Sequence, residues 1–216
     1  MTPLNYQRPE DYRAEHRRAV RRRFLGTDHA AAFEAFARET GASYFPGRWS
    51  TMPGTIVTGI GPWTLTLSTR WGDSINLMRL SAPLLLACDF RFLIRPFGFL
   101  DQLGEFIRLR RLDTGEKRFD ANFISTTNRP DLLRQLLQRD NIRTLYRSFF
   151  DATFDLQRPL SRLVRRRQPP TADLVLVCQG VNSEASYLTR MHTLFAQTLP
   201  TLVDLGVTFK TRHGPA

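Results

Sequence analysis

Residues 63–68 alternate strictly between apolar and hydroxyl side chains, and this pattern constrains the fold more than any other feature of the chain. The apolar side chains are Trp63, Leu65 and Leu67, and the hydroxyl side chains are Thr64, Thr66 and Ser68. Such alternation predicts a strand with one face on a core and the other face wet or covered by helices, as in antiparallel sheets. The preceding TIVTGIGP segment ends in a turn signal, so residues 55–68 are predicted to form a hairpin.

Further strand-like segments follow at short spacing. They are SINLMRL at 74–80, LLLACDFRFLI at 84–94, FIRLRRL at 106–112 and RFDANFIST at 118–126. The DTGEK sequence between the last two is typical of a turn. Together with the hairpin, these segments predict six strands in an antiparallel meander sheet.

A pair of helices is predicted before the sheet. Residues 9–25 begin with Pro9 in the first turn and end before Gly26. The second helix runs from Asp28 to about Thr40, where Gly41 closes it, and it is expected to bury Phe33, Phe36 and Ala37.

Beyond residue 128 the hydrophobic period becomes helical. RPDLLRQLLQ and residues 141–149 predict two helices, and ATFDLQ and ADLVLVCQG predict two more strands. The last helix begins near Asn182, and Pro200 is expected to kink or split it. The chain therefore belongs to the α+β class: an N-terminal helical pair, an antiparallel meander sheet, then helices packed on the sheet with two further strands. The predicted organisation is a basic helical segment at 1–41, one α+β domain at 42–212 and a tail at 213–216.

Composition bounds the class of protein. Hydrophobic residues make up 42% of the chain and 16 residues are phenylalanine, which excludes a disordered protein. Cys88 and Cys178 lie in apolar runs and read as buried small side chains in a reducing compartment. The N-terminus lacks the apolar core of a signal peptide, and no apolar run is long enough to span a bilayer. We therefore expect a cytoplasmic protein.

The formal net charge is +11, and only Lys117 and Lys210 of the 31 basic residues are lysine. Arginine is favoured where phosphate is gripped through two hydrogen bonds, but a GC-rich genome also replaces lysine by arginine throughout. Genome composition can explain why arginine is used instead of lysine, but it does not explain the excess of basic over acidic residues.

One segment resembles a known group. GEKRFDANFIS, followed by the leucine-rich LLRQLLQ helix, a strand pair and a closing helix, resembles bacterial proteins that carry a domain of unknown function with a G-[DE]-x-x-FD-x-x-F segment. The resemblance covers residues 115–205. It implies a shared fold and no activity.

Sequence motifs for catalysis are absent. No HExxH pair, GxSxG, Walker loop or GxGxxG after a strand occurs, and the four histidines are scattered. Neither catalytic residues, a cofactor nor a metal are expected. Asp120, between two aromatic residues, is predicted to be a buried aspartate paired with an arginine.

We consider three hypotheses of function. The first is a non-enzymatic protein that binds nucleic acid, DNA or RNA, through phosphate contacts with little sequence specificity. The second is a protein-interaction or self-assembly module, whose basic helix docks on an acidic partner or whose phenylalanine-bearing second helix docks on a second copy. The third is an enzyme with a site around Asp120 or Asp89. The predicted nucleic-acid-binding residues are Arg13, Arg17, Arg18, Arg21, Arg22, Arg23, Arg108, Arg110, Arg111, Arg162, Arg165, Arg166 and Arg167.

A membrane-surface helix at 9–25 was the remaining alternative. Its apolar stripe of Tyr12, Val20 and Phe24 is too narrow to sink deeply among acyl chains. Its charge could nevertheless hold it to anionic headgroups.

Overall fold

The computed structural model describes residues 29–47, 54–70, 76–96, 110–157 and 171–209. The strands are β1 (Ser43–Phe45), β2 (Thr55–Ile60), β3 (Trp63–Arg70), β4 (Leu77–Leu85), β5 (Phe92–Pro96), β6 (Arg110–Leu112), β7 (Phe123–Thr127), β8 (Ala152–Gln157) and β9 (Thr171–Gln179). The helices are α2 (His29–Thr40), α3 (Lys117–Asn122), α4 (Pro130–Leu137), α5 (Asp140–Arg147) and α6 (Ala185–Asp204).

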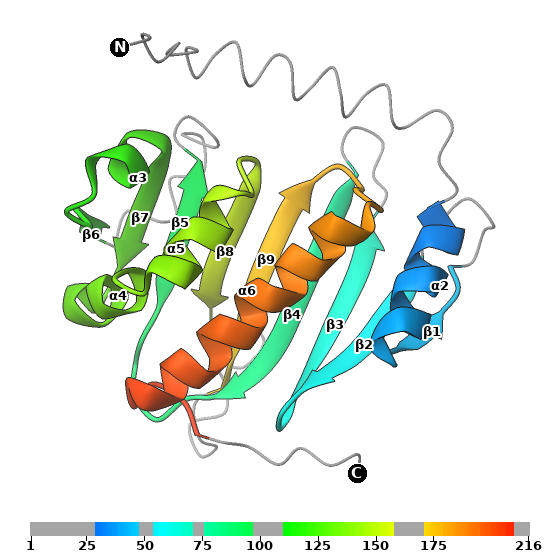
Figure 1. Cartoon of the computed structure of the whole chain (residues 1–216). Helices are drawn as coiled ribbons and strands as arrows, with labels where there is room; N and C mark the ends of the chain where they lie inside the picture. The colour runs from blue at the N-terminus through cyan, green and yellow to red at the C-terminus, as the bar shows by residue number, and fades with distance from the viewer. Residues whose placement is uncertain (1–28, 48–53, 71–75, 97–109, 158–170, 210–216) are drawn as a thin grey trace, which may run out of the picture.

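All nine strands join in one antiparallel sheet, in the order β1-β2-β3-β4-β9-β8-β5-β7-β6 (Figure 1). The α+β class and the antiparallel sheet are thus confirmed. The two strands that come late in the chain, β8 and β9, lie in the middle of the sheet. They separate β4 from β5, and β9 pairs with β4 along nine residues.

The predicted hairpin is present. Ile60 and Trp63 face each other at its end, and Gly61 takes a φ of 56°, which a side chain would disfavour. Trp63, Leu65 and Leu67 are buried, whereas Thr64 between them is exposed. The alternation in the sequence therefore correctly predicted which side chains of β3 face the core and which do not.

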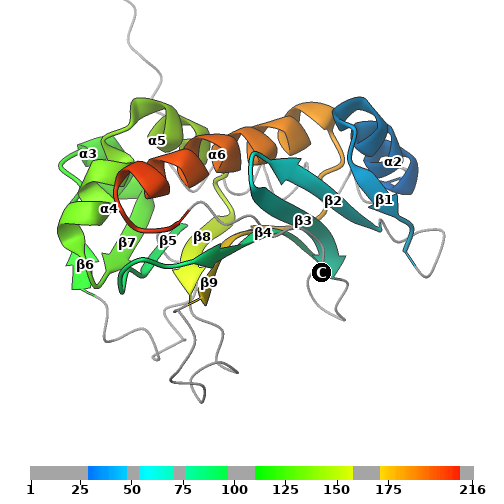
Figure 2. The ribbon, with the colours of Figure 1, turned by 90° about the horizontal axis from the view of Figure 1, so that it is seen from below.

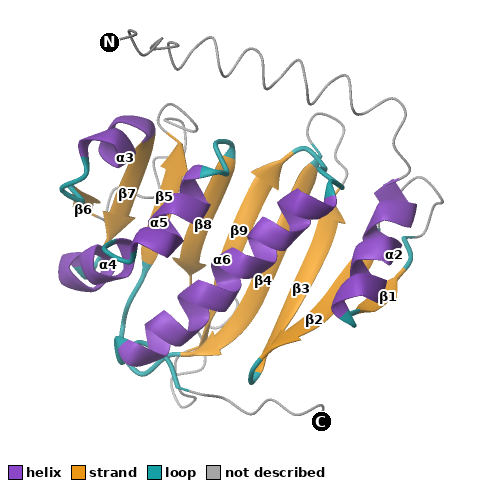
Figure 3. Ribbon diagram, viewed as in Figure 1, coloured by secondary structure: helices purple, strands orange, loops and turns teal. Residues whose placement is uncertain are grey.

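The helices α2, α4, α5 and α6 lie on one face of the sheet, and the core lies between these two layers (Figures 2 and 3). The longest helix, α6, crosses the middle of the sheet and buries Leu188, Phe195 and Leu202. It continues through Pro200, so the predicted split does not occur. Pro200 is exposed, which keeps its ring out of the packed interface.

The phenylalanines of α2 belong to this core. Phe33 and Phe36 are buried, and α2 packs against β1, β2 and α6. These two side chains are therefore used within the chain and are not available for contact with a second copy, and the hypothesis that the helix docks on a second copy stays a prediction.

A buried tyrosine ties α5 to the sheet. Tyr146 is fully buried, and its hydroxyl lies 3.0 Å from the carbonyl oxygen of Ile94 on β5 and 2.8 Å from that of Ala152 on β8. It can donate to either oxygen, so one side chain fixes the place where β5 and β8 meet. Burial raises the pKa of this phenol well above its ordinary value, which keeps it protonated as a donor.

Two predicted strands differ from the structure, and two further predicted elements lie wholly or partly outside the described residues. The strand expected at 84–94 is broken, since β4 ends at Leu85 and β5 begins at Phe92. Residues 118–126 were expected to form one strand, but they form the short helix α3 followed by β7. Of the strand expected at 106–112, the described part is β6. The helix expected at 9–25 lies outside the described residues.

The two cysteines are free thiols. Cys178 is buried on β9, and burial raises the pKa of its thiol to about 12. Cys88 is half-buried. At neutral pH the Cys178 side chain thus behaves as a small apolar group rather than as a nucleophile.

Candidate functional site

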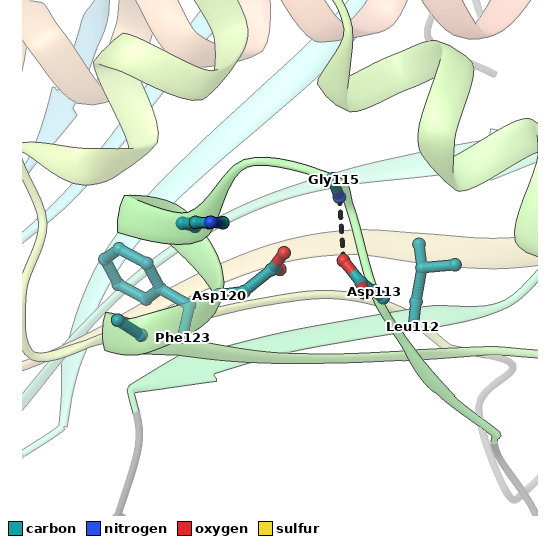
Figure 4. A pocket seen from close by; sticks show the side chains of 7 residues that line it. Leu112, Asp113, Gly115, Asp120 and Phe123 are labelled. Carbon is teal, nitrogen blue, oxygen red and sulfur yellow. Dashed lines mark hydrogen bonds between the residues drawn. The ribbon is translucent and has the colours of Figure 1, made fainter.

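A pocket opens beside α3, where β6, the following turn and β7 meet (Figure 4). Its volume is about 610 Å³. The residues that line it are Leu112, Asp113, Gly115, Lys117, Asp120, Ala121 and Phe123. Two acidic side chains and one basic side chain therefore share a hollow with an apolar wall.

The FDANF sequence spans the end of α3 and the first residue of β7, and it brings two phenylalanine rings together. Phe119 and Phe123 are four residues apart, and their ring centroids lie 4.9 Å from each other. Both rings are buried, and both pack near Tyr146, with centroid distances of 6.1 and 5.0 Å. With the phenylalanines anchored in the core, Asp120 is left on the side of the helix that borders the pocket.

Asp120 holds the turn that precedes its own helix. Its carboxylate accepts hydrogen bonds from the backbone N–H of Thr114, at 3.2 and 3.3 Å, and from the Thr114 hydroxyl at 2.9 Å. Asp113 closes the same turn by accepting from the N–H of Gly115 at 2.9 Å. Both carboxylates face the pocket (Figure 4).

The pKa of Asp120 is raised above its usual value of 3.8. Partial burial is the largest cause, and the nearby carboxylate of Asp113 raises it further. The hydrogen bonds from Thr114 act in the opposite direction, because they favour the ionised form. The carboxyl group of Asp113 therefore disfavours ionisation of Asp120 at the rim of the turn.

The predicted pairing of Asp120 with an arginine is replaced by this contact with Thr114. The carboxylate that meets arginines is that of Glu116, at 3.5 Å from Arg143 and 3.8 Å from Arg147. These ion pairs join the turn to α5. The DTGE sequence predicted the turn, but only the folded chain places the Thr114 hydroxyl next to the Asp120 carboxylate.

Two substitutions separate the causes of the raised pKa of Asp120. Asp113→Asn is expected to lower the pKa of Asp120, and Thr114→Val is expected to raise it, as measured by NMR titration of the Asp120 carboxyl carbon. Because the pKa is higher in the folded state than in the unfolded state, Asp120 makes the protein less stable as the pH rises from 3.8 through the folded-state value.

A matched control for this titration is Asp131→Asn, which removes an exposed carboxylate of α4 that is paired with Arg134. It should leave the Asp120 titration where it is. An unchanged Asp120 pKa in Asp113→Asn would show that the two carboxyl groups do not interact.

The chemistry available in the pocket is that of hydrogen-bond acceptance and proton exchange. Within the part of the chain that the structure describes, no group of three or more histidine, cysteine or acidic residues could hold a metal ion. Asp89, the other acidic residue considered, lies 3.4 Å from Arg91 and away from this pocket's lining.

Most of the arginines predicted to bind nucleic acid lie outside the described residues. These are Arg13, Arg17, Arg18, Arg21, Arg22, Arg23, Arg108, Arg162, Arg165, Arg166 and Arg167. Arg110 and Arg111 begin β6, opposite Thr127 and Thr126 of β7. The role given to these arginines therefore stays a prediction.

Charge is unevenly distributed along the sequence. The described residues hold 15 of the 31 basic residues and 13 of the 20 acidic residues, so the folded scaffold is nearly neutral. The other segments hold the remaining 16 basic residues and 7 acidic residues. The basic excess thus belongs to the segments that flank and connect the sheet. Among the described helices, none is both long and apolar enough to cross a membrane.

No family model matches the chain, and no curated protein matches its sequence. A solved structure does match its fold: the crystal structure of the mycobacterial trehalose monomycolate transport factor A, TtfA. The match has a TM-score of 0.51 at 10% sequence identity, and covers 82% of this chain and 96% of TtfA. The likeness therefore concerns the architecture of nearly the whole domain.

This comparison contradicts the prediction of a nucleic-acid-binding protein, because the protein that shares the architecture is a trehalose monomycolate transport factor. The physical reason for the error is that the prediction rested on charge. A basic protein attracts any surface that carries phosphate, so its charge does not distinguish a nucleic acid from an anionic lipid headgroup.

Proposed function

We propose that this protein is a non-catalytic accessory factor in lipid transport that works at a membrane surface. The observation that carries the proposal is the architecture shared with TtfA over almost the full length of that chain. The one-sided, nine-stranded sheet is the scaffold in this proposal, and the segments around it make the contact with lipid.

The charge distribution supports contact with anionic headgroups. The scaffold is nearly neutral, whereas the connecting segments carry the basic excess, including four arginines at 162–167. Basic residues near a membrane surface contribute about 1 kcal/mol each to binding of anionic lipid. A neutral body with basic segments can thus be attracted to a membrane without a helix that crosses it.

The pocket beside α3 does not serve as the anion contact in this proposal. Asp113 and Asp120 place negative charge in its lining, and Lys117 supplies the single basic group. A phosphate would meet repulsion from the acidic pair. Attraction to anionic lipid therefore falls to the basic segments.

Flotation of the full chain with lipid vesicles tests this function. Vesicles that contain phosphatidylglycerol should carry the protein upward, and vesicles of phosphatidylcholine alone should not. Replacement of Arg162, Arg165, Arg166 and Arg167 by glutamine should weaken binding by a factor approaching a thousand, at about 1 kcal/mol per residue. Moderate salt should also weaken binding to the anionic vesicles, because it screens the charges.

The scaffold provides a control with the same change in charge. Arg70, Arg118, Arg129 and Arg139 are exposed, and their replacement by glutamine should leave vesicle binding nearly unchanged. Failure of the wild-type chain to float with anionic vesicles would contradict the proposal. An equal loss in both variants would show that total charge, rather than the basic segment, drives the attraction.

A further inference from the structure

The two ends of the sheet differ in charge. The strand at one end, β6, has the sequence RRL, whereas the strand at the other end, β1, has the sequence SYF and carries no charge (Figure 1). An edge strand leaves the N–H and C=O of every second residue without a strand partner. Charged residues on an edge oppose pairing with another sheet, and the sequence of β6 carries two arginines whereas that of β1 carries none.

An exposed aromatic side chain lies on the uncharged edge. Phe45 is 56% exposed, although phenylalanine is normally buried. It lies opposite Thr55 of β2, and Ser43 lies opposite Val57, so both point to the face of the sheet away from the helices. Tyr44 lies opposite the buried Ile56 and points to the other face. Among the described strands, none pairs with the outer side of β1, and the exposed Phe45 ring lies beside it.

We propose that two copies of this chain associate edge to edge through β1, so that the two sheets become continuous. Antiparallel pairing about a two-fold axis at Tyr44 sets the small Ser43 of each copy against the partner's Phe45. The edge is thus complementary to itself in size as well as in backbone pairing. The same operation on β6 would set arginines near arginines.

The helix above this edge has a charge order that suits the same two-fold axis. In Figure 2, α2 lies over β1 at the end of the molecule. Its exposed Glu34 and Arg38 lie one turn apart and form an ion pair of 3.1 Å. Two copies of α2 would run in opposite directions, so that Glu34 can approach the partner's Arg38 and the reverse. Ala35, which is also exposed, has a side chain small enough to allow this approach.

The oligomeric state of the full chain tests the inference. In sedimentation velocity over a protein concentration series, the mass should rise from 24.9 kDa toward twice that value. Phe45→Lys places like charges near the two-fold axis and should move the midpoint of association to at least about tenfold higher concentration. Phe209→Lys is the matched control, because Phe209 is 52% exposed and lies away from β1, and it should leave the midpoint unchanged.

Hydrogen exchange locates the interface. Exchange of the backbone amides of β1 should slow as protein concentration rises, while exchange in β6 should not change. Should Phe45→Lys fail to fold by circular dichroism, Ser43→Lys, at an exposed position on the same face, gives the same test. A chain that stays monomeric throughout the series overturns the proposal, as does a dimer without added protection at β1 or equal effects of the Phe45 and Phe209 variants. Vesicle binding by a monomeric variant would leave the proposed function intact.

Discussion

Phe119→Ala is expected to lower the free energy of unfolding by about 3–5 kcal/mol, which is the usual cost of removing a buried phenylalanine. Phe119 has no exposed surface, and its ring packs against Phe123 and Tyr146. Its loss leaves a cavity under α3 and removes the anchor that holds the helix over β7. Urea denaturation followed by circular dichroism measures the change.

A control with the same chemistry exists at the surface. Phe209→Ala removes an equal number of atoms from a side chain that is 52% exposed, and it should cost less than about 1 kcal/mol. Because α3 also forms one wall of the pocket, Phe119→Ala should change the NMR environment of Asp120 as well. Similar costs for both substitutions would contradict the role given to FDANF in the core.

Gly54→Ala is expected to have an effect of about 3 kcal/mol or more, for a different reason. A β-carbon at Gly54 would lie 1.8 Å from the carbonyl oxygen of Phe45 and 2.8 Å from the Cα of Pro46. Both contacts are with backbone, which cannot rotate away as a side chain can. The substitution should therefore push β1 off β2, and thermal denaturation should report the loss.

Gly54 immediately precedes β2, and its matched control is Gly59→Ala within that strand. A β-carbon there would meet the carbonyl oxygen of Trp63 at 3.8 Å, which is an ordinary contact. This substitution should change the free energy of unfolding by only about 0.5–1 kcal/mol in either direction. That is the usual difference between glycine and alanine in regular structure. Equal destabilisation by the two variants would exclude the close approach as the cause.

The vesicle and association experiments address different parts of the molecule. The first depends on the basic segments between the elements of the sheet, and the second on three uncharged residues of β1. A monomeric variant such as Phe45→Lys therefore allows lipid binding to be measured without self-association. The outcomes of the two experiments can be assigned separately.

Sequence periodicity predicted the α+β class because burial acts on single elements. Leu65 and Leu67 alternate with threonine in β3, and Leu133, Leu136 and Leu137 recur at helical spacing in α4. The misreading of residues 118–126 has the same origin. Phe119 and Phe123 are four apart, a spacing that puts two side chains on one face of a helix and also on one face of a strand, so it does not distinguish the two.

The function could not be read from the residues in the same way. Net charge indicates attraction to phosphate but does not show which kind of molecule carries the phosphate. The arginine runs therefore led to the wrong prediction of nucleic-acid binding. The pocket also escaped prediction, because Thr114 and Asp120 become partners only when α3 folds back over its own turn.

The sequence by itself determined which residues face the core in elements such as β3 and α4, because that choice depends on a repeat of two or of about 3.6 residues. Only the tertiary structure decided the order of the strands. The insertion of β8 and β9 between β4 and β5 depends on pairing between residues as far apart as Met78 and Cys178. No local pattern encodes such a pair, since every strand in an antiparallel sheet offers the same backbone groups to its neighbours.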